Sequence, residues 1–205
     1  MNRSPIKIFI ASNRSVGRKC QKYAEDNLPD GYQITSDIEE SDIVFSIIYD
    51  KIFSEDFLLG RKCFNFHYGI LPDYGGVGSA TWVILNDEQQ HGVTLHEITA
   101  GLDQGPIIHI DKFSLEDNDT ALSLYEKCEV ILFQMFQSYF LRLLSGEYES
   151  YEQTQKPTMY RRRKLEMSKD ITKIVRAFYF PGKEDVYYYS KSGKKIYVKY
   201  DVEEI

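Results

Sequence analysis

Short apolar runs alternate with segments of helical spacing in the first part of the chain, and few folds accommodate such a pattern. Ile6–Ala11 is an apolar run that ends in polar residues, and Val16, Cys20 and Ala24 follow it at helical spacing. Three further runs have the length and composition of strands: Tyr32–Thr35, Asp42–Tyr49 and Cys63–Phe66. Strands that alternate with helices predict an α/β fold, with a mostly parallel sheet flanked by helices.

A loop separates this part from a second group of predicted elements. Residues 71–78 are rich in turn formers and predict a loop, after which Ser79–Asn86 predicts a helix. Gly92–Thr99 and Pro106–Phe113 predict a pair of strands. Thr120–Ser145 predicts the longest helix, which Gly146 ends and which can cover one face of the sheet.

The composition changes after Gly146, because nine of the sixteen tyrosines lie from Tyr148 onward. We therefore expect a first domain at residues 1–146 and a small α+β extension at residues 147–205. The extension should contain a linker, a helix from Ser168 to Phe178, and a β-hairpin with strands near 186–190 and 196–200.

Charge and apolar content exclude several classes of protein. Lys and Arg number 25 against 31 Asp and Glu, a formal charge of −6, which disfavours a dedicated nucleic-acid binder. No apolar stretch approaches the roughly 20 residues that cross a bilayer, and the run near the start is too short for a signal peptide. We expect a cytoplasmic protein that binds neither nucleic acid nor membranes.

The spacing of Cys20, Cys63 and Cys128 indicates reduced thiols, with no metal site.

Three polar residues could carry chemistry. Asn65 and His67 are two apart at the end of a predicted strand, so their side chains point to one face of the sheet. Asp103 lies between two glycines in the loop that joins the next two strands, and ligands bind at the carboxyl ends of such strands. Acyl transfer to an amine needs an amide donor for the oxyanion, an imidazole that moves protons and a carboxylate that orients the imidazole and favours its charged form. The same residues could instead serve structure, with Asp103 bonded to loop amides.

Three segments together resemble the formyltransferases that use 10-formyltetrahydrofolate. The segments are Phe64–Pro72, Trp82 with Gly92–His96, and Gly101–Ile107. The resemblance is strongest over residues 43–110. It implies a Rossmann-like catalytic domain in which Asn65, His67 and Asp103 are catalytic, with 10-formyltetrahydrofolate as cosubstrate and no metal. It also implies a pterin slot held mainly by backbone, at Ile48, Tyr49, Asp50, Ile52, Phe53 and Leu102.

The later part of the chain narrows the resemblance. Residues 160–163 and 174–182 are similar to the stretch after the catalytic domain in methionyl-tRNA and sugar N-formyltransferases, which glycinamide ribonucleotide formyltransferases lack. Only 23 residues follow Gly182, too few for the β-barrel of the tRNA enzymes, and the chain is acidic. The resemblance thus implies formylation of a nucleotide-linked amino-dideoxy sugar, of the dTDP type, for a surface polysaccharide such as lipopolysaccharide O-antigen. The expected sugar-binding residues are Tyr74, Gly75, Gly76, Trp82, His96, Arg161 and Phe178.

Some features depart from the family pattern and keep alternatives open. Gly75 stands where the family usually has arginine, and Ser79 where proline is common. Only 64 residues precede Asn65, which indicates a shortened or absent strand-helix unit. One alternative is a non-catalytic relative that binds folate or a nucleotide sugar; another is a formyltransferase for methionyl-tRNA or glycinamide ribonucleotide. The sugar, its amino position, the nucleotide and the choice between monomer and homodimer stay open.

Overall fold

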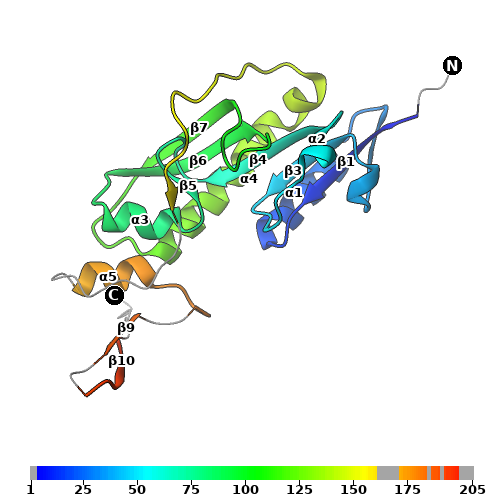
Figure 1. Ribbon diagram of the computed structural model, residues 1–205. Helices are drawn as coiled ribbons and strands as arrows, with labels where there is room; N and C mark the ends of the chain where they lie inside the picture. Colours follow the sequence, from blue (N-terminus) through cyan, green and yellow to red (C-terminus); the bar gives the residue numbers. More distant parts are fainter. Residues whose placement is uncertain (1–3, 161–170, 184–185, 190–191, 199–205) are drawn as a thin grey trace.

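The computed structural model describes residues 4–160, 171–183, 186–189 and 192–198, and its centre is a six-stranded sheet (Figure 1). The helices and strands in chain order are β1 (Ile6–Ala11), α1 (Ser15–Asp26), β2 (Tyr32–Ile34), the 3₁₀ helix η1 (Ile38–Glu40), β3 (Ile43–Ile47), α2 (Glu55–Leu58), β4 (Lys62–Tyr68), β5 (Gly75–Gly76), α3 (Ser79–Leu85), β6 (Gln90–Glu97), β7 (Ile107–Ser114), α4 (Ala121–Ser145), β8 (Met159–Tyr160), α5 (Ile171–Phe178), β9 (Val186–Tyr189) and β10 (Lys195–Val198).

The sheet has the strand order β2-β1-β3-β4-β6-β7. The first four strands are parallel to one another, whereas β6 runs antiparallel to both β4 and β7. This arrangement confirms the predicted mostly parallel α/β fold. Every residue of β3 is buried, since parallel strands in the middle of such a sheet are covered on both faces.

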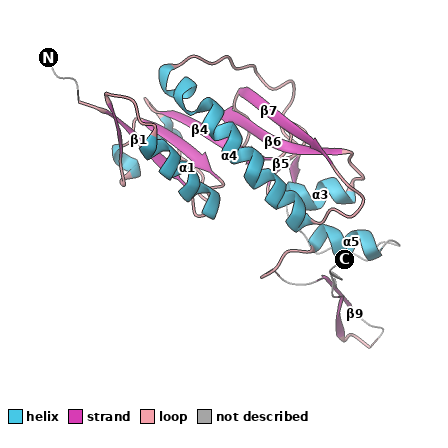
Figure 2. Ribbon diagram, turned by 180° about the vertical axis from the view of Figure 1, so that it is seen from behind, coloured by secondary structure: helices cyan, strands magenta, loops and turns pink. Residues whose placement is uncertain are grey.

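Helices α1 and α4 lie across one face of the sheet (Figure 2). The core there is aromatic: the ring of Phe136 on α4 lies 5.6 Å from those of Phe45 on β3 and Phe66 on β4. Helix α4 begins at a capping box formed by Thr120 and Ser123 and ends at Gly146, whose φ of 79° favours glycine. The predicted long helix that covers one face is therefore confirmed.

The opposite face of β1, β3 and β4 has a thinner cover. The stacked rings of Tyr49, Phe53 and Phe57 pack there against Ala11, Val44 and Cys63. The connection from β2 to β3 contains only η1, where parallel strands are usually joined through a full helix. This short connection accounts for the small number of residues that precede β4.

Several predicted boundaries move in the structure, and the strand expected at Gly92–Thr99 is β6, which spans Gln90–Glu97. Strand β3 ends at Ile47 rather than Tyr49, because Ile48 has a φ of 50°, a left-handed conformation that cannot continue a strand. Strand β4 continues to Tyr68, so His67 lies within it.

The strands β9 and β10 form the predicted antiparallel hairpin. Arg161 and the predicted cap Ser168 lie outside the described residues.

His91 is buried although the polar residues that precede it, Glu88, Gln89 and Gln90, are typical of a turn. It lies on β6 with no exposed surface, its ring 5.7 Å from that of Phe113. Neither ring nitrogen has a hydrogen-bond partner among the described residues. Burial, together with the charge of His67, lowers the pKa of His91 to about 3. His91 is therefore neutral in the folded protein at physiological pH.

We expect acid to destabilise the fold through His91. Because the folded pKa lies below the ordinary value of 6.5, the unfolded chain binds more protons below pH 6.5, and stability falls with pH from there toward pH 3. In urea unfolding, His91→Leu should remove about 2 kcal/mol of the stability loss between about pH 7.5 and about pH 5. An equal loss in both proteins would contradict this assignment.

Candidate active site

Strands β4 and β6 place three polar side chains side by side. In their antiparallel register, Asn65 is opposite His96 and His67 is opposite Thr94. Residues two apart on a strand share a face, so Asn65 and His67 lie on one face of the sheet, as predicted. Asn65 and His67 on β4 and His96 on β6 thus come from two strands that are hydrogen-bonded along most of their length, which keeps the three side chains in fixed positions.

Asp103 reaches this face from the loop between β6 and β7. Its φ is 55°, and the loop is tightly folded, because a Cβ at Gly105 would lie 1.8 Å from the carbonyl oxygen of Glu97. The carboxylate oxygen Oδ1 lies 3.8 Å from both His67 Nδ1 and His96 Nε2, and the side chains of all three residues are buried. The structure therefore places Asp103 beside His67 and His96, and His96 in turn contacts Asn65, so the three residues proposed from the sequence lie in one cluster.

His96 holds the amide of Asn65. Burial and the nearby His67 lower the pKa of His96 to about 4, so its ring is neutral. Its Nδ1 donates to the carbonyl oxygen of Glu97 at 2.7 Å, which leaves Nε2 to accept from Asn65 Nδ2 at 3.1 Å. One N–H of the Asn65 amide is thus engaged, and the other, which has no partner within the part of the chain that the structure describes, can donate to a ligand. The sequence predicted His96 as a sugar contact, and the structure shows that its Nε2 is occupied by the amide of Asn65.

The ring of His67 is oriented by a loop rather than by Asp103. His67 Nε2 donates to the carbonyl oxygen of Tyr74 at 2.7 Å, and Gly76 N donates to Asp103 Oδ2 at 2.8 Å. The distance of 3.8 Å between His67 Nδ1 and Asp103 Oδ1 is too long for a hydrogen bond. Asp103 therefore does not orient the ring directly, contrary to the prediction from the sequence. A proton on Nδ1 would nevertheless lie beside a carboxylate. The predicted contact of Asp103 with loop amides is also present.

An aromatic cluster adjoins this loop. Tyr74 is buried and stacks on Tyr160, at 5.0 Å between ring centroids, and the ring of Trp82 also packs on Tyr160, at 5.1 Å. Phe178 on α5 packs into the same cluster. Tyr160 was not predicted as a site residue, although it begins the segment 160–163 that resembles the family. Of the predicted sugar contacts, Arg161 lies outside the described residues.

The residues expected to hold a pterin lie at the ends of β3 and β6. Ile48 to Phe53 follow β3, and Ile98 packs in the same cluster as Phe53. Two of the predicted side chains are apolar and exposed: Ile52 at 75% and Leu102 at 45%. Asp50 forms an ion pair with Arg14 at 3.5 Å, a neighbour that the sequence did not indicate.

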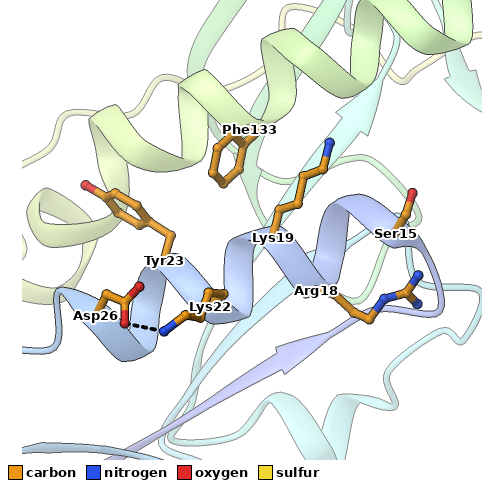
Figure 3. A pocket seen from close by; sticks show the side chains of 7 residues that line it. All are labelled: Ser15, Arg18, Lys19, Lys22, Tyr23, Asp26 and Phe133. Atoms are coloured by element: carbon orange, nitrogen blue, oxygen red, sulfur yellow. Dashed lines mark hydrogen bonds and ion pairs between the residues drawn. The ribbon is translucent and has the colours of Figure 1, made fainter.

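A separate hollow lies between α1 and α4 (Figure 3). It has a volume of about 570 Å³, and its lining includes three basic side chains of α1, one of which, Lys22, forms an ion pair with Asp26 at 2.6 Å. None of the residues predicted to act on a substrate lines it.

Within the described ranges, no group of three or more His, Cys, Asp and Glu residues is arranged to hold a metal ion. No described helix is both long and apolar enough to cross a membrane.

The chain is similar to several known proteins in sequence or in fold. The chain is 44% identical over 88 residues to the bifunctional polymyxin resistance protein ArnA of Wigglesworthia glossinidia brevipalpis, a stretch that covers 42% of this chain but only 14% of that protein. A sugar N-formyltransferase from Shewanella sp FDAARGOS_354 has a similar fold, with a TM-score of 0.82, 16% identity, and coverage of 98% of this chain and 99% of that one.

An N-formyltransferase from Helicobacter canadensis, solved with folinic acid and dTDP-3-aminofucose, has a TM-score of 0.72 and 25% identity, over 85% of this chain and 81% of that one. The family described as formyl transferase matches residues 6–136, a segment that contains Asn65, His67, His96 and Asp103. Because this match spans more than half of the chain, the protein belongs to the formyl transferase family.

Proposed function

We propose that the protein transfers the formyl group of 10-formyltetrahydrofolate to the amino group of a nucleotide-linked amino-dideoxy sugar, with dTDP as the nucleotide. The observation that carries the proposal is the meeting of Asn65, His67 and Asp103 on one face of β4 and β6 in a chain of this family. The same proposal places the protein in the cytoplasm, in the synthesis of a formylated surface polysaccharide such as O-antigen.

Each of the three residues has a distinct part in the proposed reaction. The acceptor amine attacks the formyl carbon, and the free N–H of Asn65 donates to the oxygen that becomes negative. His67 takes the proton that the amine loses and returns it to the departing nitrogen of the folate. Asp103, 3.8 Å from Nδ1, stabilises the charge on the ring between these steps. No nucleophilic serine or cysteine is needed, because the amine itself attacks.

The exposed apolar side chains support the choice of cosubstrate. Ile52 and Leu102 are apolar yet open to solvent, and they belong to the two loops expected to enclose a flat pterin ring. Large exposed apolar groups beside a catalytic cluster are typical of a ligand-binding surface. The backbone of both loops would supply the polar contacts to the ring, as the resemblance implies.

Leu102→Ala should weaken tetrahydrofolate binding by roughly tenfold or less, the effect of about 1.4 kcal/mol, since it removes apolar contact but no backbone group. Calorimetric titration of tetrahydrofolate measures this change. Leu59→Ala is the matched control, because Leu59 is also an exposed leucine but follows α2 outside both loops. Equal affinity in wild type and Leu102→Ala would remove Leu102 from the folate site, and no binding to the wild type would contradict the cosubstrate.

Residues 147–205 are proposed to form an extension that helps to bind the sugar nucleotide. The half-buried rings of Trp82 and Phe178, which lie in one cluster beside the loop of residues 74–76, support this role, because aromatic rings provide a stacking surface for a base. Initiator methionyl-tRNA and glycinamide ribonucleotide are the alternative acceptors, and binding without transfer is the non-catalytic alternative. Incubation with each acceptor, with the product identified by its mass, distinguishes them.

A further inference from the structure

Residues 151–160, here called the strap, contact the loop that carries Asp103 and the loop of residues 74–76, which is hydrogen-bonded to His67 and Asp103. In Figure 1 the strap is the yellow to gold segment that leaves α4 and runs back to β5. At its start, Tyr151 and Ile107 exchange both backbone hydrogen bonds, at 2.8 and 2.9 Å. At its end, Met159 and Tyr160 pair as β8 with Gly75 and Gly76 of β5. The strap is thus hydrogen-bonded to the sheet at one end and to the loop of residues 74–76 at the other.

In its middle, the strap holds the loop of Asp103. Gln153 Nε2 donates to the carbonyl oxygen of Asp103 at 2.7 Å and to that of Gly105 at 2.9 Å. Asp103 has a left-handed backbone, which a residue other than glycine keeps only when its surroundings hold it there. The amide of Gln153 therefore stabilises the backbone conformation that directs the Asp103 carboxylate toward the two histidines.

At its end, the strap holds the loop of residues 74–76. This loop gives its Tyr74 carbonyl to His67 and its Gly76 N–H to Asp103. Tyr160 supports it twice: its ring is stacked on Tyr74 with 14° between the planes, and its carbonyl oxygen accepts from Val77 N at 3.0 Å. The contacts that orient His67 and Asp103 therefore depend on a loop whose outer side is covered by the strap.

Gly75 is the residue that lets the strap lie so close. A Cβ at this position would lie 2.8 Å from Pro157 Cβ and 3.0 Å from Met159 Sδ. A larger side chain, such as the arginine usual in the family, would push β8 away from β5. The glycine at position 75, which departs from the family pattern, thus makes room for the strap to pack against this loop.

We propose that the strap completes the active site of this protein, with Gln153 and Tyr160 as positioning residues that act through Asp103 and through the Tyr74–Gly76 loop. The inference rests on the proposed formyl transfer, since it assigns a part in that reaction. Neither residue needs to touch a substrate. Their removal should therefore impair the chemical step rather than the binding of either substrate.

The kinetic test compares four variants. Gln153→Ala and Tyr160→Ala should each lower kcat for formyl transfer by about tenfold or more, because small displacements of catalytic groups are costly, while each KM changes by less than about threefold. Tyr160→Phe keeps the stacked ring and should retain most activity. Gln155→Ala changes an exposed glutamine of the same segment and is the matched control. An unchanged kcat, or a raised KM with kcat intact, in a variant that melts like the wild type would overturn the inference.

A second readout does not depend on activity. In protein labelled with ¹⁵N-histidine, the nitrogen shifts of His67 report which ring nitrogen carries the proton and how it is hydrogen-bonded. Gln153→Ala and Tyr160→Ala should alter these shifts, whereas Gln155→Ala should not. Unaltered shifts would contradict the positioning role. If the wild type formylates no acceptor, the proposed function fails, and these spectra still decide whether the strap orients His67.

Discussion

His67→Ala is expected to lower kcat for formyl transfer by at least about a hundredfold, because general acid–base catalysis by a positioned side chain contributes about 100- to 10,000-fold. The ring of His67 is oriented by its hydrogen bond to the carbonyl oxygen of Tyr74. Its other nitrogen, Nδ1, faces the carboxylate of Asp103. Steady-state kinetics with 10-formyltetrahydrofolate and a dTDP-amino sugar measures the effect. The KM of the sugar should change little, since the ring moves protons rather than binding the nucleotide.

His109→Ala is the matched control for this prediction. His109 lies on β7 of the same sheet, where it pairs with Asp111 at 3.0 Å and packs on Tyr139, and it takes no part in the cluster. Its replacement should leave kcat unchanged. Turnover by His67→Ala within about threefold of the wild type would remove His67 from the chemical step. A circular dichroism melt separates loss of the residue from loss of the fold.

Asn65→Ala is expected to lower kcat by about 100- to 1000-fold, the effect of removing one donor from an oxyanion site. The neutral ring of His96 accepts one N–H of the Asn65 amide, so the second is held in a fixed direction with no freedom to turn away. Asn65→Asp should be at least as inactive, because it replaces the donor by a negative charge beside the developing oxyanion. Rapid-quench measurement of a single turnover isolates the chemical step.

Asn27→Ala provides the control for Asn65. Asn27 caps the C-terminal end of α1, where its side chain donates to the carbonyl oxygen of Tyr23 at 2.9 Å. A single-turnover rate near that of the wild type is expected for this variant. If Asn65→Ala also retained that rate, the oxyanion would have to be stabilised by another group, and the proposed mechanism would be wrong.

The local pattern of the sequence predicted most of the sheet and the placement of the candidate catalytic residues at one edge of it. Strands such as Ile43–Ile47 are apolar throughout because both their faces are buried, and that burial is what makes them recognisable. Asn65 and His67 share a face through the two-residue period of a strand, which needs no tertiary information. The approach of Asp103 followed from two glycines that fold its loop tightly against β6.

Other features arise from contacts between distant parts of the chain and left no local signal. Strand β3 stops at Ile47 because Ile48 adopts a left-handed backbone, which no propensity predicts for isoleucine. His91 follows polar residues and has the appearance of a turn, yet the pairing of β6 with β7 buries it. Gln153 and Tyr160 reach the site by pairing across some 50 to 85 residues, so neither is recognisable from its neighbours.

The mass of the product tests the central claim most directly. The wild-type protein is incubated with 10-formyltetrahydrofolate and, in separate reactions, dTDP-linked amino-dideoxy sugars, initiator methionyl-tRNA and glycinamide ribonucleotide. We expect at least one dTDP-amino sugar to gain the mass of a formyl group less the hydrogen that it replaces, with an equal amount of tetrahydrofolate released, and the same product to form at least about a hundredfold more slowly with His67→Ala. Formylation of the tRNA or of glycinamide ribonucleotide alone would contradict the substrate class, and release of no tetrahydrofolate with any acceptor would contradict the account as a whole.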